Sequence, residues 1–323
     1  MLAVRDRRAC PGGAIIASYH RGPVASFFSA TAGLVPAGPS LNGYNARSNA
    51  FAFDFAHMPM PEPLYTVANC RIAYQLHWSL TLFAKQAWPE KEGWWQPLRE
   101  AVEPDGVRLL EFQHREQAVG QFFVSSRPEV SPAEIVRSVK GRLQHLVRDA
   151  ISQFWRRHYS ITSVGDANND VLQEYVARQV RHHPMADRSA VERLLEVQFH
   201  DPLVDLAALR ASAHGRFTNS LHMVLENADR LCDTREEWLA PSRATLIAVC
   251  RKKGWLLSRL ALAGNHLHML FGCDVVDVPR DAALSLMNNL AFAHGMKPIC
   301  EHSFYVGTFG PYDHDAIRRR LSA

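Results

Sequence analysis

Two stretches, QLHWSL (residues 75–80) and SLHMVL (residues 220–225), look alike, and each lies in an alternating apolar run that predicts a β-strand. A second pair, HYSITSVG (158–165) and SFYVGTFG (303–310), also looks alike, and each member predicts a strand that closes on a glycine turn. The chain therefore contains two similar pieces of sequence in each of its halves.

Both pairs have the same separation along the chain. Leu76 and Leu221 are 145 positions apart, and so are Gly165 and Gly310. Because two independent matches share one separation, they indicate an internal repeat, and each half is expected to form the same structural unit.

The segments between the matched strands correspond as well. In each half an amphipathic helix, two apolar strands, a second helix that begins at a proline, a strand that ends in glycine and a final helix follow in order. The first helix, the two strands and the second helix are expected at about 89–104, 106–114, 118–126 and 131–151, and again at about 233–253, 255–263, 265–272 and 279–295. This β-α-β-β-α-β order is that of the ferredoxin-like fold. The sequence therefore predicts an α+β protein with two ferredoxin-like lobes, each ending in an added helix, fused in one chain.

The repeat also predicts the domain boundaries. The first lobe is expected at residues 63–183 and the second at 215–323, joined by a helical linker at 184–214. Residues 1–62 are rich in Gly, Ala, Ser and Pro without a helical or alternating period, which predicts a poorly ordered leader. A start codon assigned too far upstream is the alternative interpretation. Two fused lobes would make an internal pseudo-dimer, so we expect a monomer.

The composition is that of a globular protein with a hydrophobic core. Hydrophobic residues make up 47% and charged residues 21% of the chain. No apolar run approaches the roughly 20 residues of a membrane helix, so no membrane partner is expected. The formal net charge of +4 permits a nucleic-acid partner but is equally typical of an ordinary solvated surface. The six cysteines form no CxxC pair, which favours reduced thiols in a cytoplasmic protein.

The stretch GNHLHMLF (264–271) carries two histidines in one predicted strand. Residues two apart on a strand point to the same face, so His266 and His268 have the geometry of two ligands to one metal ion. Because so short a motif also arises by chance, two surface or capping histidines are the alternative interpretation.

At this point the sequence resembles a known family. GNHLHMLF is similar to the (D/N)HxH motif of the single-tyrosine HUH transposases of insertion sequences and of the related REP-associated tyrosine transposases. SPAEIVRSVKGR (131–142) resembles a helix of that family, and SVGDANNDVLQEYVARQ (163–179) resembles its tyrosine helix, with YxxxQ at Tyr175 and Gln179. The resemblance implies two HUH-type lobes in a nucleoid-associated, transposase-like protein that binds single-stranded or hairpin DNA.

Each half departs from the family pattern in the opposite way. In the first half, counting back from the glycine turn places the histidine positions at Val119–Gln121, where no histidine stands. In the second half, the position that corresponds to Tyr175 is Arg320. One lobe thus keeps the histidines and the other keeps the tyrosine.

This division leads to the hypothesis of one composite active site. In active homodimers of the family, the histidine pair of one subunit works with the tyrosine helix of the other. The resemblance implies that His266, His268 and Gln179 hold a divalent ion, Mg²⁺ or Mn²⁺, and that Tyr175 attacks a DNA phosphate, giving a 5′-phosphotyrosine and a free 3′-OH. A metal ion would neutralise phosphate oxygens that otherwise repel a nucleophile. The i, i+4 spacing puts Tyr175 and Gln179 on one helix face.

Other interpretations of these residues stay open. Tyr175 would otherwise be a packing residue of an amphipathic helix, and Gln179 a surface amide. Lys140 and Arg142 either contact nucleic-acid phosphates or are ordinary exposed cations. The alternative function is that of a catalytically inactive, domesticated transposase that binds hairpin DNA or RNA. An unrelated metal hydrolase is disfavoured, because no carboxylate that could act as a base is evident near the two histidines.

Overall fold

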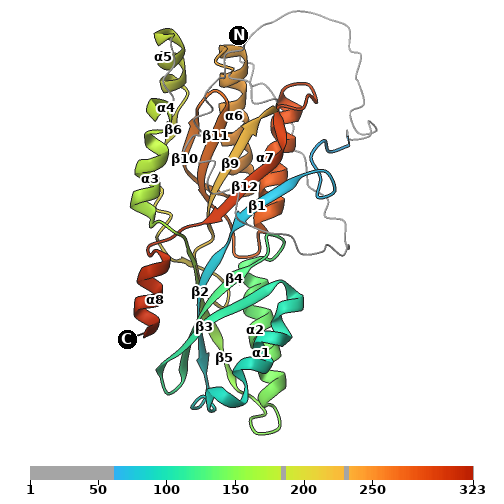
Figure 1. The fold of residues 1–323 in the computed structure, drawn as a ribbon, viewed down its shortest axis with the longest axis vertical. Helices are drawn as coiled ribbons and strands as arrows, with labels where there is room; N and C mark the ends of the chain where they lie inside the picture. The colour runs from blue at the N-terminus through green and yellow to red at the C-terminus, as the bar shows by residue number, and fades with distance from the viewer. Residues whose placement is uncertain (1–61, 183–186, 229–232, 323) are drawn as a thin grey trace, which may run out of the picture.

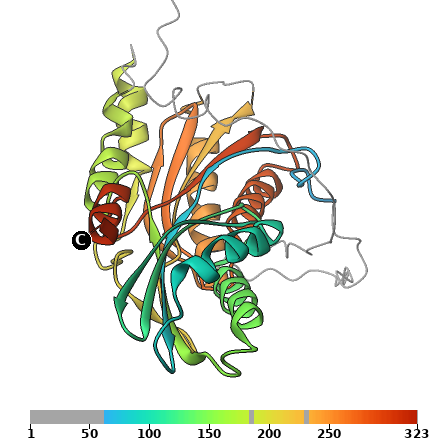
Figure 2. The ribbon, with the colours of Figure 1, turned by 60° about the horizontal axis from the view of Figure 1, so that its bottom comes forward.

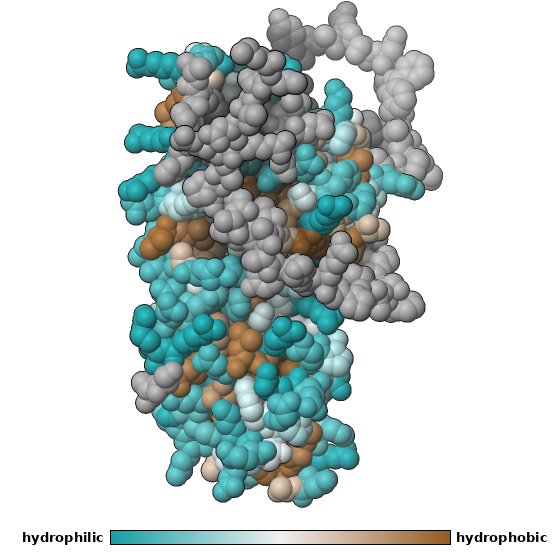
Figure 3. Space-filling model, viewed as in Figure 1, coloured by the Kyte–Doolittle hydropathy of each residue, from teal (hydrophilic) through white to brown (hydrophobic). Residues whose placement is uncertain are grey.

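The computed structural model describes residues 62–182, 187–228 and 233–322. The leader expected at residues 1–62 therefore lies outside the described residues, apart from Glu62. No helix in these three ranges is both long enough and apolar enough to cross a membrane. On the face drawn in Figure 3 hydrophilic residues predominate, and apolar residues show between them in small groups.

The protein is built on two six-stranded sheets, one in each half of the elongated molecule (Figure 1). We call them the first and the second sheet. The first sheet has the order β3 (Val107–Glu116), β4 (Val119–Ser126), β2 (His77–Ala84), β5 (Trp155–Val164), β8 (Gly215–Phe217) and β7 (Arg210–Ala211). The second has the order β10 (Leu256–Leu262), β11 (His266–Gly272), β9 (Ser220–Asn227), β12 (Cys300–Thr308) and β1 (Arg71–Gln75), with β6 (Phe199–His200) beside β10.

Each sheet carries the ferredoxin-like arrangement. The central strands run β3-β4-β2-β5 in the first sheet and β10-β11-β9-β12 in the second, which is the same order in both halves. The helices are α1 (Trp95–Val102), α2 (Pro132–Val147), α3 (Asn169–Ala177), α4 (Gln179–His182), α5 (Arg188–Glu196), α6 (Glu236–Lys253), α7 (Pro279–Ala293) and α8 (His314–Ser322). The expected α+β protein with two ferredoxin-like lobes is thus confirmed.

Helices cover both faces of the sheets. Helices α1, α2, α6 and α7 lie on one side, and α3, α5 and α8 lie on the other (Figure 2). The alternation of side chains along the strands explains why α6 and α7 cover one face of the second sheet. Leu221, Met223 and Leu225 of β9 all join the core that includes these two helices. The residues between them, such as His222, face the α3 side.

The sequence sets the start of α2 locally. Ser131 Oγ accepts a hydrogen bond from the Glu134 backbone N–H at 3.3 Å, and Glu134 Oε2 accepts one from the Ser131 N–H at 2.9 Å. This reciprocal capping box, with Pro132 as the first helical residue, satisfies backbone donors that a helix start otherwise leaves unpaired. The first helix of that half is shorter than the expected 89–104, because 3₁₀ turns at Lys91–Gly93 and Glu103–Asp105 flank α1.

The two halves exchange strands. Strand β1 precedes β2 in the chain yet pairs in parallel with β12 of the second sheet, and β8 precedes β9 yet pairs in parallel with β5 of the first sheet. The chain passes from one sheet to the other at Leu76, which is buried, and again at Thr218 and Asn219. Neither exchanged strand was predicted, because a short parallel strand gains its partners only through distant parts of the chain.

The final helices are exchanged in the same way. Helix α3, from the first half, packs on the second sheet, where Val176 joins a buried cluster with Ala261 and Leu270. Helix α8, from the second half, packs on the first sheet, where Ile317 joins Phe123. Each lobe is therefore completed by a helix that belongs, in sequence, to the other lobe.

Two glycines lie where the exchanged segments cross. The Asn169 N–H donates to the Gly310 carbonyl at 2.8 Å, and the His314 N–H donates to the Gly165 carbonyl at 2.9 Å. A Cβ atom on Gly310 would overlap the carbonyl oxygen of Ser163, and one on Gly165 would overlap that of Thr308. The crossing therefore requires glycine at both positions because the two backbones approach too closely for a side chain.

The segment 184–214 was expected to be a helical linker, and this expectation is wrong beyond Val197. Helix α5 occupies its first part, but β6, turns and β7 follow. Asp201 Oδ1 accepts a hydrogen bond from the Leu203 N–H at 3.0 Å, and Asp205 Oδ1 accepts one from the Ala207 N–H at 2.8 Å. Such aspartate turns compete with helix formation, and here they prevail because the segment also adds strands to both sheets.

Candidate active site

His266 and His268 lie on β11, in the middle of the second sheet. The strand register sets His266 opposite Glu226 and His268 opposite Val224 of β9. Leu267 and Met269 alternate with them and join the core on the α6 and α7 side. Both imidazoles therefore face the other side of the sheet, where α3 packs. The expectation that no carboxylate lies near the two histidines is therefore wrong, because strand pairing sets Glu226 directly opposite His266.

A third histidine holds one of the pair. The Nε2 atom of His222 lies 3.0 Å from Nδ1 of His268, and the two rings are stacked with centroids 5.3 Å apart. Burial lowers the pKa of His222 to about 4, so this ring is neutral at pH 7. A hydrogen bond to one ring nitrogen fixes the tautomer and the orientation of an imidazole. The sequence held a signal for His222, because a histidine stands at this position in both repeats, as His77 and His222.

The two predicted histidines are close together. Their ring centroids are 4.9 Å apart, and Nδ1 of His266 lies 2.7 Å from Oδ1 of Asn265. Within the three described ranges, no group of three or more His, Cys, Asp or Glu side chains could hold a metal ion. The histidine pair would thus need further ligands of another kind.

Tyr175 reaches this site from the other half of the chain. Its ring centroid lies 5.7 Å from that of His268 and 6.5 Å from that of His222, and its side chain is 40% exposed. Gln173 fastens α3 to β10, because its amide donates to Ser258 Oγ at 2.9 Å and accepts from Arg259 Nε at 3.0 Å. The exchanged helix thus holds Tyr175 beside the histidines of the second lobe.

Gln179 lies at the start of α4 and is buried. Its Nε2 donates to the backbone carbonyl oxygen of Tyr175 at 3.2 Å. One end of the amide is therefore bound to the end of α3, on the chain segment that carries Tyr175.

Lys140 and Arg142 are bound within the protein. Nζ of Lys140 donates to the carbonyl oxygens of Arg156 at 2.7 Å and Arg157 at 3.3 Å. Arg142 binds the Asp105 carboxylate through two hydrogen bonds of 2.9 and 3.1 Å. Both lie on α2, on the opposite side of the first sheet from α8, and they do not join the histidines and Tyr175.

The strand register corrects where the first lobe carries the positions of the two histidines. Gln121 and Phe123 face Thr81 and Ser79 of β2, as His266 and His268 face their partners on β9. The count that pointed to Val119–Gln121 placed these positions two residues too early. Pairing with a neighbouring strand fixes which side chains face one side of a sheet, whereas a count across loops does not.

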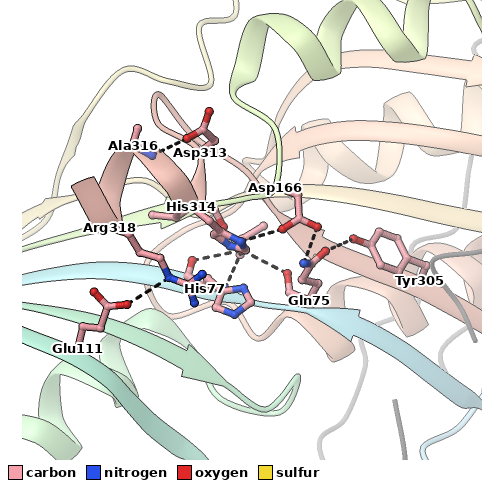
Figure 4. Close-up of polar contacts among 11 residues, drawn as sticks. Gln75, His77, Glu111, Asp166, Tyr305, Asp313, His314, Ala316 and Arg318 are labelled. Carbon is pink, nitrogen blue, oxygen red and sulfur yellow. Dashed lines mark hydrogen bonds and ion pairs between the residues drawn. The ribbon is translucent and has the colours of Figure 1, made fainter. Parts of the chain in front are cut away.

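A polar network joins the two lobes (Figure 4). It lies between the histidines of the second sheet and the equivalent positions of the first sheet. His314 Nδ1 lies 2.7 Å from Asp166 Oδ1, and Gln75 Nε2 donates to Asp166 Oδ2 at 2.6 Å. The Tyr305 hydroxyl lies 3.4 Å from Gln75 Oε1, and the ring of His77 meets that of His314 edge-on at 4.2 Å. These contacts tie α8 to β1 and β2 and help to fix one lobe against the other.

Because His77 is partly buried, we expect the protein to lose stability in acid. Burial, together with the nearby His314, lowers its pKa to about 4. The unfolded chain therefore takes up this proton near pH 6.5 and the folded chain only near pH 4, so stability falls as the pH drops between these values, by roughly 2 kcal/mol at pH 5. We expect His77→Phe to reduce the difference in melting temperature between pH 7.5 and pH 5.0. The exposed His158, changed to Gln, is the control; an equal reduction by both variants would contradict this role.

Comparison with known proteins supports the resemblance seen in the sequence. Residues 85–179 match the family model described as "Transposase IS200 like", a range that contains Tyr175 and ends at Gln179. No curated protein matches the chain.

Solved structures of transposases show local similarity only. A protein from Deinococcus radiodurans R1 described as a transposase is 16% identical, with a TM-score of 0.27, and the match covers 35% of this chain and 95% of that protein. A REP-associated tyrosine transposase bound to a REP hairpin is 13% identical, with a TM-score of 0.26, over 32% of this chain. The match spans 62% of that second structure, which is less than two thirds of its length. Through the family model, the resemblance is confirmed: over residues 85–179 this chain is similar to the IS200-like transposases.

Proposed function

We propose that this transposase-like protein nicks and rejoins single-stranded DNA through a 5′-phosphotyrosine intermediate at one composite, metal-dependent site. The observation that supports it most is the position of Tyr175. Its helix comes from the first half of the chain, yet its ring lies 5.7 Å from that of His268 in the second half. The residue proposed as the nucleophile and one of the two proposed metal ligands thus lie close together, although they come from different halves of the chain.

The proposed metal at this site is a divalent ion such as Mg²⁺ or Mn²⁺. His266 and His268 project from one face of β11 with their rings 4.9 Å apart, a spacing that suits two ligands of one ion. Ions of this kind keep several waters and take few protein ligands besides phosphate oxygens. The amide oxygen of Gln179 is the proposed third ligand. When bound, the ion would neutralise the phosphate and orient it.

The residues of the chain would carry out the transfer. The Tyr175 oxygen forms a bond to phosphorus and loses its proton, while the bond from phosphorus to the 3′ oxygen breaks and that oxygen gains a proton. The reverse reaction rejoins the strand, because the phosphotyrosine keeps the phosphate activated. Tyr175 is 40% exposed, as a residue that meets a DNA strand has to be. His222 holds the ring of His268, and Gln179 holds the end of α3.

The proposed partner is single-stranded or hairpin DNA. Both parts of the composite site belong to one chain, so we propose that the protein acts as a monomer, as an internal pseudo-dimer. With DNA as its proposed substrate, we propose that the protein works in the cytoplasm, at the nucleoid.

A second candidate function is non-catalytic binding of hairpin DNA or RNA by a domesticated transposase. The observation that favours it is the loss of one of the two sites, since Arg320 stands at the position equivalent to Tyr175 and Gln121 and Phe123 stand at the histidine positions. A protein that no longer needs to cleave two ends would tolerate such losses.

Covalent attachment to DNA separates the two candidates. Wild-type protein incubated with a hairpin oligonucleotide from its own locus and Mn²⁺ is expected to form an adduct that resists denaturing electrophoresis and disappears with EDTA. The double variant His266→Ala/His268→Ala should lower its rate about 100-fold or more, because the phosphate charge stays unneutralised. His214→Ala/His302→Ala, at two exposed histidines, is the matched control.

The outcomes are distinct. An unchanged adduct in the His266→Ala/His268→Ala variant would show that the proposed site is wrong. Wild-type protein that forms no adduct with either metal, but binds the hairpin as tightly as the double variant does, would support the second candidate function, non-catalytic binding.

A further inference from the structure

A second place in the structure is equivalent to the composite site. Helix α8 starts at His314 and α3 at Asn169, which are 145 positions apart, and each packs on the sheet of the other lobe. Arg320 on α8 occupies the position that Tyr175 has on α3. With Gln121 and Phe123 at the histidine positions, this place has neither the nucleophile nor the imidazole pair.

Two arginines line this second place. Arg115, at the end of β3, is exposed, and its Nε donates to Gln121 Oε1 at 2.6 Å. Arg320 is exposed on α8, and burial first and the charge of Arg320 second lower the pKa of Arg115. In the part of the chain that the structure describes, neither arginine forms an ion pair with a carboxylate. One guanidinium group thus contacts a residue at a histidine position, and the other stands at the tyrosine position, where the composite site would hold a phosphate.

The surroundings favour a nucleic-acid strand as the occupant. The nearby Glu111 is bound by Arg318 at 3.1 Å, so this carboxylate is already neutralised (Figure 4). The guanidinium of Arg320 lies 4.8 Å from the ring centroid of Tyr312, whose side chain is 43% exposed. Guanidinium groups bind phosphate through paired hydrogen bonds, and exposed aromatic rings stack on unpaired bases.

We propose that Arg115, Arg320 and Tyr312 form a second, non-cleaving site for single-stranded DNA, in which the arginines bind backbone phosphates and Tyr312 stacks on a base. This rests on the proposed function in one respect, namely that single-stranded DNA is the partner. The pseudo-dimer would then cut a strand at one site and hold a strand at the other.

The test measures binding separately from cleavage. All variants are made in full-length protein that carries Tyr175→Phe, and the probe is a fluorescent 30-nucleotide oligothymidylate, followed by anisotropy at several salt concentrations. Arg115→Ala/Arg320→Ala is expected to weaken binding about tenfold at moderate salt. The slope of log K against log salt should fall by about 1.4, because each lost phosphate contact accounts for about 0.7 on a single strand.

Three comparisons make the result specific. Arg251→Ala/Lys252→Ala removes the same charge from the exposed end of α6 and should leave the slope unchanged. Arg115→Lys/Arg320→Lys keeps both positive charges and should keep most of the affinity, which would show that the loss in the alanine pair comes from the missing charges. Tyr312→Ala should weaken binding of the oligothymidylate but not of a 30-base-pair duplex.

The proposal is overturned if the alanine pair binds the oligothymidylate like the α6 control, or if its slope does not change. An equal loss on the duplex in Tyr312→Ala would refute the stacking role. Failure of the proposed function shows differently, as the absence of a covalent adduct in protein that retains Tyr175. That result would leave these binding measurements, made without cleavage, fully interpretable.

Discussion

Replacing Tyr175 with phenylalanine is expected to abolish the covalent protein–DNA adduct, with a loss of at least about 1000-fold in the rate of strand cleavage. The change removes one oxygen atom, the proposed nucleophile, and leaves the ring beside His268 in place. Because the side chain is 40% exposed and its hydroxyl supports no core packing, stability should be unaffected. The measurement is adduct formation on a hairpin oligonucleotide with Mn²⁺, together with a thermal melt.

Tyr74 offers a matched control. It is 39% exposed, and its strand β1 lies at the edge of the second sheet, so Tyr74→Phe makes the same chemical change at similar exposure. This variant should form the adduct at the wild-type rate. Persistence of the adduct in Tyr175→Phe would mean that another residue is the nucleophile.

Replacing Gly310 with alanine is expected to destabilise the protein by about 3 kcal/mol, which corresponds to a fall of roughly 5 to 10 °C in melting temperature. The added Cβ would overlap the backbone carbonyl oxygen of Ser163, and backbone cannot move aside as a flexible side chain can. The Gly310 carbonyl also accepts the Asn169 N–H at the start of α3, so a shift there should displace Tyr175 and slow adduct formation as well.

Gly141→Ala is the control for this substitution. Gly141 lies inside α2, and a Cβ atom there would meet nothing within 4 Å. Alanine is favoured over glycine in a helix, so this variant should be as stable as wild type or more stable by up to about 1 kcal/mol. If Gly310→Ala melts like Gly141→Ala, the close approach at the crossing does not limit stability.

Local patterns in the sequence were sufficient for the fold class. Alternating apolar residues, the capping box at Ser131 and the repeat at 145 positions each depend on neighbouring residues or on the comparison of two halves. They predicted two ferredoxin-like lobes with most strands in the right places. The residue types in GNHLHMLF and in the tyrosine helix were likewise enough to select Tyr175, His266 and His268 as candidates.

Other features depend on contacts between distant parts of the chain. The exchange of β1, β8, α3 and α8 between lobes follows from parallel pairing and packing across more than 50 positions, which no local pattern encodes. The same is true of the contact between His222 and His268, which joins residues 46 positions apart. The turns after α5 likewise prevailed over an apparent helical pattern because their strands pair with both sheets.

The sequence by itself thus determined the two lobes, the histidine pair in one and the tyrosine in the other. The meeting of the two was only a hypothesis from the resemblance, and it took the tertiary structure to decide it: the tyrosine helix crosses to the histidines of the other lobe, with 5.7 Å between the ring centroids of Tyr175 and His268. The physical reason is that side-chain periodicity depends on local backbone geometry, whereas the choice of which sheet an amphipathic helix covers depends on the apolar surface that the whole fold leaves open.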